Sequence, residues 1–331
     1  MHIDLAMLRS LEREKDIPFD ELVEIIEQAV HSAYVRNQVN LGEPAPEDDQ
    51  VRVEVDRRTG DIGVYAPEFD DAGNVIGEAH ITADEFGRIA AAAAKQVINQ
   101  RMRDLSDDQV LGAFKDKEGQ IASGVVQQGP NPKMVHIDLG EVEAILPPEE
   151  QVPGEEYPHG TRLRVFVTSV SKGLRGPQVV VSRTHPGLVR KLFEMEVPEL
   201  TSGAVEIVSL AREAGHRTKV AVRAKEPGIN AKGTCIGEMG RRVRAVMASL
   251  GDEKIDIVDY STELTEFVAN ALSPAKVTDV FMLNAEMKQV RALVPDYQLS
   301  LAIGKEGQNA RLAAKLTGAK IDIQPDSVME Q

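Results

Sequence analysis

Two short glycine motifs are the parts of this chain whose residue types and spacing favour a chemical role. Each has the form Gly-x-x-Gly, at residues 237–240 and 304–307, and each directly follows an isoleucine. Because glycine has no Cβ, another backbone can approach such a turn closely, and a helix that begins there directs its free N–H groups outward. The motifs therefore suit a chain of phosphates, as in a nucleic acid backbone.

The two motifs lie at equivalent places in an internal repeat. In each copy an arginine stands four residues after the second glycine (Arg244 and Arg311), and an Ile-Asp-Ile run follows further on. Each copy has the pattern of a helix, two strands, a helix, the glycine motif, a helix and a strand. One such motif is most often an ordinary turn between helices, but its duplication in one context argues against chance. The repeat predicts two KH modules, each of which clamps about four nucleotides of RNA.

The candidate RNA contacts are the loop residues and the polar residues that open the next helix. Lys305 lies inside the second loop, where its ammonium can meet a phosphate, and Val243 and Ala310 help to line the apolar grooves for the bases. The first set is Ile236, Gly237, Glu238, Met239, Gly240, Arg241, Arg242 and Arg244, and the second is Ile303, Gly304, Lys305, Glu306, Gly307, Gln308, Asn309 and Arg311.

The net charge of −15 argues against a nucleic acid partner for the chain as a whole, but the acidity is uneven. Residues 1–112 hold 24 acidic and 11 basic side chains, whereas residues 212–244 hold nine basic and three acidic ones. A solvated face is the usual meaning of such a charge run. Here Arg212, Arg217 and Lys219 flank a predicted hairpin beside the first loop, so they are further possible RNA contacts.

Five strand patterns between residues 119 and 183 predict a small β-barrel. In the fourth pattern, alternation directs Val165 inward and leaves Arg162, Arg164 and Phe166 together on the outer face. Cations beside an aromatic ring can support stacking of single-stranded bases, so these three residues are possible RNA contacts. A purely structural role is at least as good an interpretation, because the neighbouring strands carry acidic residues.

The first 112 residues predict a separate domain. Two helical patterns come first, the second beginning at Pro18 and Phe19, and alternating valines at residues 51–55 then lead into a hairpin. An alanine-rich run from Thr82 to Met102 predicts a long helix that connects this domain to the next.

Several classes of protein and site are excluded or disfavoured. No apolar run is long enough to span a bilayer, and the amino terminus lacks the pattern of a secretory signal, so we expect a cytoplasmic protein without a membrane partner. The single cysteine, Cys235, cannot form an internal disulfide and is expected to be a buried structural thiol. Histidines at ligand spacing, a nucleophile motif and a Walker loop are all lacking, so we expect no catalytic residues, metal or cofactor.

Several runs of residues resemble the NusA family of transcription elongation factors. They are Val181-Ser182-Arg183-Thr184-His185-Pro186, Leu192-Phe193-Glu194-Met195-Glu196-Val197-Pro198-Glu199, Val205-Glu206-Ile207, Ala211-Arg212-Glu213, Lys219-Val220-Ala221-Val222, Ile255-Asp256-Ile257-Val258, Asn270-Ala271-Leu272-Ser273-Pro274-Ala275 and Lys95-Gln96-Val97-Ile98. The resemblance covers essentially the whole chain.

This resemblance implies a multidomain α+β protein. Residues 1–112 would form an N-terminal α/β domain that ends in the connector helix and binds RNA polymerase near its RNA exit channel. Residues 113–184 would form a five-stranded S1-type OB barrel. Residues 185–262 and 263–331 would form two tandem type II KH domains that hold nascent single-stranded RNA, with Arg241 and Arg242 as phosphate contacts.

The resemblance also implies a function and further partners. The chain would be a non-enzymatic RNA-binding factor that regulates pausing, intrinsic termination and antitermination, including that of ribosomal RNA operons, together with other antitermination factors. The chain ends soon after the second KH domain, without the acidic repeats of some family members, so we expect RNA binding without a step that unmasks it. An RNA-processing or RNA-degradation component, which uses the same S1 and KH modules, and a ribosome-associated scaffold are the alternatives.

Overall fold

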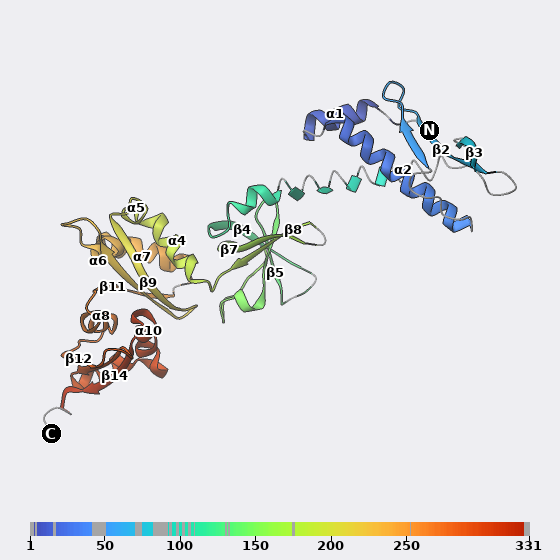
Figure 1. Cartoon of the computed structure of the whole chain (residues 1–331). Coiled ribbons are helices and arrows are strands. Elements are labelled where there is room, and N and C mark those ends of the chain that lie inside the picture. Colours follow the sequence, from blue (N-terminus) through green and yellow to red (C-terminus); the bar gives the residue numbers. More distant parts are fainter. Residues whose placement is uncertain are drawn as a thin grey trace. The chain divides into compact units, whose positions relative to one another are not determined.

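A computed structural model gives the structure of the protein and divides it into two units, Met1–Gln109 and Val110–Gln331, which we describe separately (Figure 1). It describes residues 3, 5–15, 18–41, 51–69, 75–81, 92, 95–96, 99–100, 103–104, 107–108, 110–129, 131, 133–173, 176–251 and 253–327.

The first unit packs one long helix against a three-stranded sheet. Helices α1 (Leu5–Lys15) and α2 (Phe19–Leu41) precede the antiparallel strands β1 (Arg52–Val55), β2 (Ile62–Phe69) and β3 (Val75–Ile81), in the order β1-β2-β3. Helix α2 begins directly after Pro18. Two acidic residues in its first turn interact favourably with the positive end of the helix dipole. Its apolar stripe, which includes Leu22 and Ile26, shares a buried core with Val55 and Val64 of the sheet.

The predicted helices and hairpin of this unit are confirmed, and the structure adds strand β3. Most of the predicted connector helix, from Thr82 to Met102, lies outside the described residues. Its described positions at 95–96 and 99–100 are helical, and the Gln100 side chain donates a hydrogen bond of 2.9 Å to Asp104, four residues on.

The second unit begins with a closed barrel, as predicted. Its strands are β4 (Ile121–Gln127), β5 (Val135–Asp138), β6 (Glu143–Leu146), β7 (Arg162–Gly173) and β8 (Gly176–Ser182). The order β4-β5-β6-β8-β7 closes between β7 and β4, with β6 and β8 parallel, and the other pairs are antiparallel. Val165, Val167 and Val181 fill the interior, and Phe114 adds its ring to the same core.

Two copies of one α/β module follow the barrel, and they confirm the internal repeat. The first comprises α4 (Pro186–Glu196), α5 (Pro198–Thr201), β9 (Val205–Glu213), β10 (Arg217–Ala224), α6 (Ala231–Ile236), α7 (Arg241–Ser249) and β11 (Lys254–Asp259). The second comprises α8 (Leu264–Ala271), β12 (Asp279–Asn284), β13 (Gln289–Val294), α9 (Leu299–Ile303), α10 (Gln308–Thr317) and β14 (Lys320–Pro325). In both sheets the central strand is antiparallel to the first strand and parallel to the last, which is the type II KH arrangement.

The two KH modules share part of their cores. Ala211, Ala221 and Val258 of the first module belong to one buried cluster with Phe267 and Leu312 of the second. Apolar burial between the modules stabilises their mutual arrangement, because separating them would expose this surface to water. Within the described residues, no helix is long and apolar enough to cross a membrane.

Candidate nucleic-acid interface

The two glycine loops have nearly the same backbone. The first glycines, Gly237 and Gly304, have φ/ψ of 75°/169° and 78°/170°, and the second glycines, Gly240 and Gly307, have 75°/17° and 74°/14°. A Cβ on Gly237 would lie 2.7 Å from Cγ of Arg242, so the first glycine also makes room for the chain behind it. These backbone conformations favour glycine at all four positions.

Each loop has exposed cations beside it. In the first module, Arg241 and Arg244 open α7 and are exposed, and Met239 at the loop tip is 87% exposed. In the second module, Lys305 in the loop and Arg311 on α10 are exposed. Arg241, Arg244 and Lys305 have no ion pair within the part of the chain that the structure describes. Their positive charges are therefore available to a phosphate.

Arg242 and Asn309 occupy equivalent positions behind the loops. Arg242 donates hydrogen bonds to the carboxylate of Glu199 at 2.9 Å and to the carbonyl of Thr234 at 2.8 Å. Asn309 is 1% exposed and donates to the carbonyls of Leu272 and Ala302. Contrary to the expectation for these residues, the structure does not bring them to the phosphate-facing surface, because both hold the loop to the helices behind it.

The cations Arg212, Arg217 and Lys219 are all ion-paired inside the first module. The side chains of Arg212 and Glu253, 2% and 0% exposed, pair at 2.9 Å, and Thr218 also bonds Glu253. Arg217 and Lys219 both pair with Asp256, and the Lys219 ammonium donates to the carbonyl of Ser273 at 2.6 Å. The structure therefore corrects the expectation that Arg212, Arg217 and Lys219 offer free charge to RNA, because their carboxylate partners lie in the adjacent strand β11 or just before it.

Burial and charge oppose each other in these pairs. Burial would raise the pKa of Glu253. The hydrogen bonds and the charge of Arg212, together with hydrogen bonds from Thr218 and the Gly215 N–H, outweigh burial and hold the pKa below its usual value. Burial lowers the pKa of Lys219, and the charge of Asp256 only partly opposes this shift. Cys235 is buried as predicted, and burial raises the pKa of its thiol to about 11.

The outer face of the barrel strand is also partly covered. Phe166 is 8% exposed, belongs to the core cluster of the first KH module and stacks on His185, with ring centroids 4.5 Å apart. Arg164 donates to the hydroxyl of Ser249 in that module at 3.2 Å, whereas Arg162 is exposed. Alternation correctly directs Phe166 outward, but the KH module packs on this face, so the ring does not lie free for base stacking.

Sequence reasoning missed Arg183, which joins the barrel to the first KH module. Its side chain is 2% exposed, pairs with Glu155 and donates to the carbonyls of Arg164 and Ser249 at 2.9 and 3.0 Å. No local signal distinguishes it, because an arginine at the end of a strand usually faces solvent.

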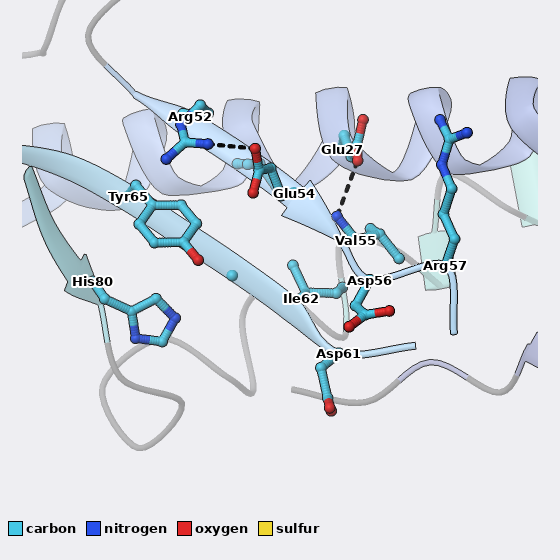
Figure 2. Close-up of a pocket in the computed structure, with 12 residues that line it drawn as sticks. Glu27, Arg52, Glu54, Val55, Asp56, Arg57, Asp61, Ile62, Tyr65 and His80 are labelled. Atoms are coloured by element: carbon cyan, nitrogen blue, oxygen red, sulfur yellow. Dashed lines mark hydrogen bonds and ion pairs between the residues drawn. The ribbon is translucent and has the colours of Figure 1, made fainter. Parts of the chain in front are cut away.

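The first unit has a polar hollow of about 920 Å³ beside strands β1 and β2 (Figure 2). The guanidinium of Arg52 lies 4.6 Å from the Tyr65 ring centroid and pairs with Glu54, and the Val55 N–H donates to Glu27 at 2.9 Å. Charges of both signs pair with each other here. Within the described residues, no group of three or more His, Cys, Asp or Glu side chains could hold a metal ion.

A closed five-stranded barrel followed by two KH modules, with both glycine loops exposed, defines a class of RNA-binding protein. Comparison with known families narrows this class. Models of the NusA-like first KH domain, the NusA-like second KH domain and the NusA N-terminal domain match residues 183–260, residues 264–331, and residues 5–69 and 66–108. The chain belongs to the NusA family.

Two bacterial relatives agree with this assignment. The transcription termination/antitermination protein NusA of Mycobacterium tuberculosis is 50% identical over 334 residues, which cover 99% of this chain and 94% of the relative. The protein of the same name from Bacillus subtilis is 46% identical and covers 98% of this chain and 91% of its own length. The solution structure of the N-terminal domain of NusA from B. subtilis is 36% identical and covers 30% of this chain and 93% of its own, with a TM-score of 0.23.

Proposed function

We propose that this protein is an RNA-binding regulator of transcription, acting in termination and antitermination as the names of its relatives describe. The observation that carries the proposal is the pair of glycine loops with matching backbones, each beside exposed cations. The loop glycines let the RNA backbone approach, and Arg241, Arg244 and Lys305 neutralise its phosphates.

Membership of the NusA family supports a role for each domain, a localisation and further partners. Residues 1–112 bind RNA polymerase, residues 113–184 form the S1-type barrel, and residues 185–262 and 263–331 hold nascent single-stranded RNA. The protein acts in the cytoplasm on pausing, intrinsic termination and antitermination, including that of ribosomal RNA operons, with other antitermination factors as partners. It acts by binding and positioning RNA and does no chemistry on it.

The mutual packing of the two KH modules supports one continuous RNA site. Because both modules contribute to one buried cluster, the two loops lie at a set distance from each other. RNA held by one loop then raises the effective concentration of its next nucleotides at the other loop. The alternative, an RNA-processing or degradation component, is not what the relatives support.

The deciding experiment places a carboxylate in each loop, with Gly240→Asp and Gly307→Asp in one variant. We expect the affinity for single-stranded RNA to fall on the order of tenfold or more, because each carboxylate repels the phosphates. Gly318→Asp is the matched control, since Gly318 also has a positive φ and, like Gly307, lies in open space, but at the far end of α10. Unchanged affinity in the folded double variant would contradict the proposal.

A further inference from the structure

A pocket of about 510 Å³ lies between the two KH modules, beside the second glycine loop. The first module contributes Glu213, Gly215, His216 and Lys254, and the second contributes Lys305, Glu306, Gln308 and Arg311. His216, Lys254, Lys305 and Arg311 are exposed at its rim. The pocket thus gathers cations from both modules where an RNA backbone leaving the second loop would pass.

The carboxylate of Glu213 lies where a bound anion would accept hydrogen bonds from the pocket. It accepts a hydrogen bond of 2.6 Å from Nε of Arg311 and one of 2.9 Å from the Gln308 amide. The hydrogen bond from Arg311 lowers the pKa of Glu213, so the carboxylate is charged at neutral pH. Both donors lie in the first turn of α10, directly after the glycine loop, where a phosphate would also be held.

The first module provides an internal comparison. Arg241 and Arg244 stand at the positions of Gln308 and Arg311, one and four residues after the second glycine. Among the described residues, Arg241 and Arg244 have no carboxylate partner. The second loop therefore differs from the first in that a carboxylate from the neighbouring module already sits on its arginine.

We propose that this pocket is a phosphate subsite for RNA that spans both modules, and that Glu213 is an internal anion which the phosphate displaces from Arg311. The proposal rests on RNA binding by the glycine loops. The side chains of Arg311 and Glu213 are 48% and 20% exposed. Ion pairs that reach solvent in this way contribute less to stability than fully buried pairs, so displacement costs little. The carboxylate of Glu213 accepts one hydrogen bond from Arg311 and one from Gln308, and two oxygens of a phosphate can accept the same two bonds.

Lys254 and His216 are the side chains of the first module that extend the subsite toward that module. Lys254 begins β11, and its backbone N–H bonds the carbonyl of His216 at 3.1 Å, so both side chains extend from one corner of the sheet. When a phosphate enters and Glu213 turns away, Lys254, Lys305 and Arg311 surround it. The backbone of one RNA strand would then touch both modules at a single point.

The test measures binding of an unstructured RNA of about 12 nucleotides, enough to reach both loops, at several salt concentrations. Glu213→Gln keeps the side-chain shape and removes the charge, so we expect affinity to rise by about three- to tenfold with a steeper salt dependence. Lys254→Gln should weaken binding and make the log-log slope shallower by about 0.7. Lys320→Gln is the control, an exposed lysine at the far end of the second module.

The outcomes separate this proposal from the one on which it rests. If Gly307→Asp weakens binding while Glu213→Gln and Lys254→Gln match the unmodified protein and Lys320→Gln, the loop binds RNA and the pocket does not, which overturns the subsite. If Gly307→Asp also leaves binding unchanged, RNA binding by the second loop itself is wrong, and the subsite is wrong with it.

Discussion

Arg212 and Glu253 form a buried two-point ion pair inside the first KH module. Nε of Arg212 lies 3.0 Å from Oε1 of Glu253, and Nη2 lies 2.9 Å from Oε2. The same carboxylate also accepts hydrogen bonds from Thr218 and from the backbone N–H of Gly215, so both of its oxygens are hydrogen-bonded. A pair of this kind ties the hairpin of β9 and β10 to the start of β11.

Breaking this pair should destabilise the protein strongly. In Glu253→Gln the guanidinium of Arg212 keeps its burial but loses its counter-charge, and we expect the free energy of unfolding to fall by about 3–5 kcal/mol. Chemical denaturation of the second unit measures this. Arg223→Gln is the control, because its pair with Glu206 is 44% and 34% exposed and should contribute at most about 1 kcal/mol. Equal losses in the two variants would show that burial of the pair does not matter.

The same pair predicts how stability depends on pH. The pKa of Glu253 in the folded protein lies below its usual 4.5, so the folded form holds the proton less tightly than the unfolded form. The stabilisation is therefore fully present above about pH 4.5 and is lost as the pH falls through the folded pKa. Unfolding free energies of the unmodified protein and Glu253→Gln, measured from pH 7 to pH 3, should converge at the acid end. A constant difference across this range would contradict the pKa shift.

Arg241 and Arg242 are adjacent in the sequence, but substitution of Arg241 should affect RNA affinity and substitution of Arg242 should affect stability. Arg241→Gln removes an exposed cation, so RNA affinity should fall and the log-log salt slope should become shallower by about 0.7, with stability unchanged. Arg242→Gln breaks hydrogen bonds to Glu199 and Thr234, so stability should fall by about 1.5–3 kcal/mol. Salt-dependent binding and thermal unfolding of both variants test this. A shallower salt slope in Arg242→Gln alone would reverse the assignment.

Phe166 should matter for stability and not for RNA. The ring fills the contact between the barrel and the first KH module, so Phe166→Ala should cost about 3–5 kcal/mol of stability. The folded variant should bind RNA with unchanged affinity, in contrast to Arg162→Ala if the exposed barrel surface takes part. Binding measured well below the unfolding temperature separates the two effects. A loss of RNA affinity in folded Phe166→Ala would contradict this prediction and show that the ring takes part in RNA binding.

Local patterns predicted most of the fold. The five barrel strands and both KH modules lie where alternation, turn residues and the repeat indicated. Alternation and turn residues are signals within a few neighbouring residues, and the repeat compares two stretches of sequence directly. Strand β3 was missed, since Gly77 and Glu78 interrupt its apolar pattern and its pairing with β2 supplies what its own residues lack. Arg183 was missed for a related reason, because its partners come from the barrel and from the first KH module.

The sequence by itself determined where the loops are, since glycine favours the positive φ that Gly237, Gly240, Gly304 and Gly307 adopt. Only the tertiary structure decided which charges around those loops are free. Arg212 meets its carboxylate 41 residues away, and Arg311 meets Glu213 across 98 residues. Charge neutralisation depends on distance in space. The fold of the first module sets this distance for Arg212, and the packing of the two modules sets it for Arg311.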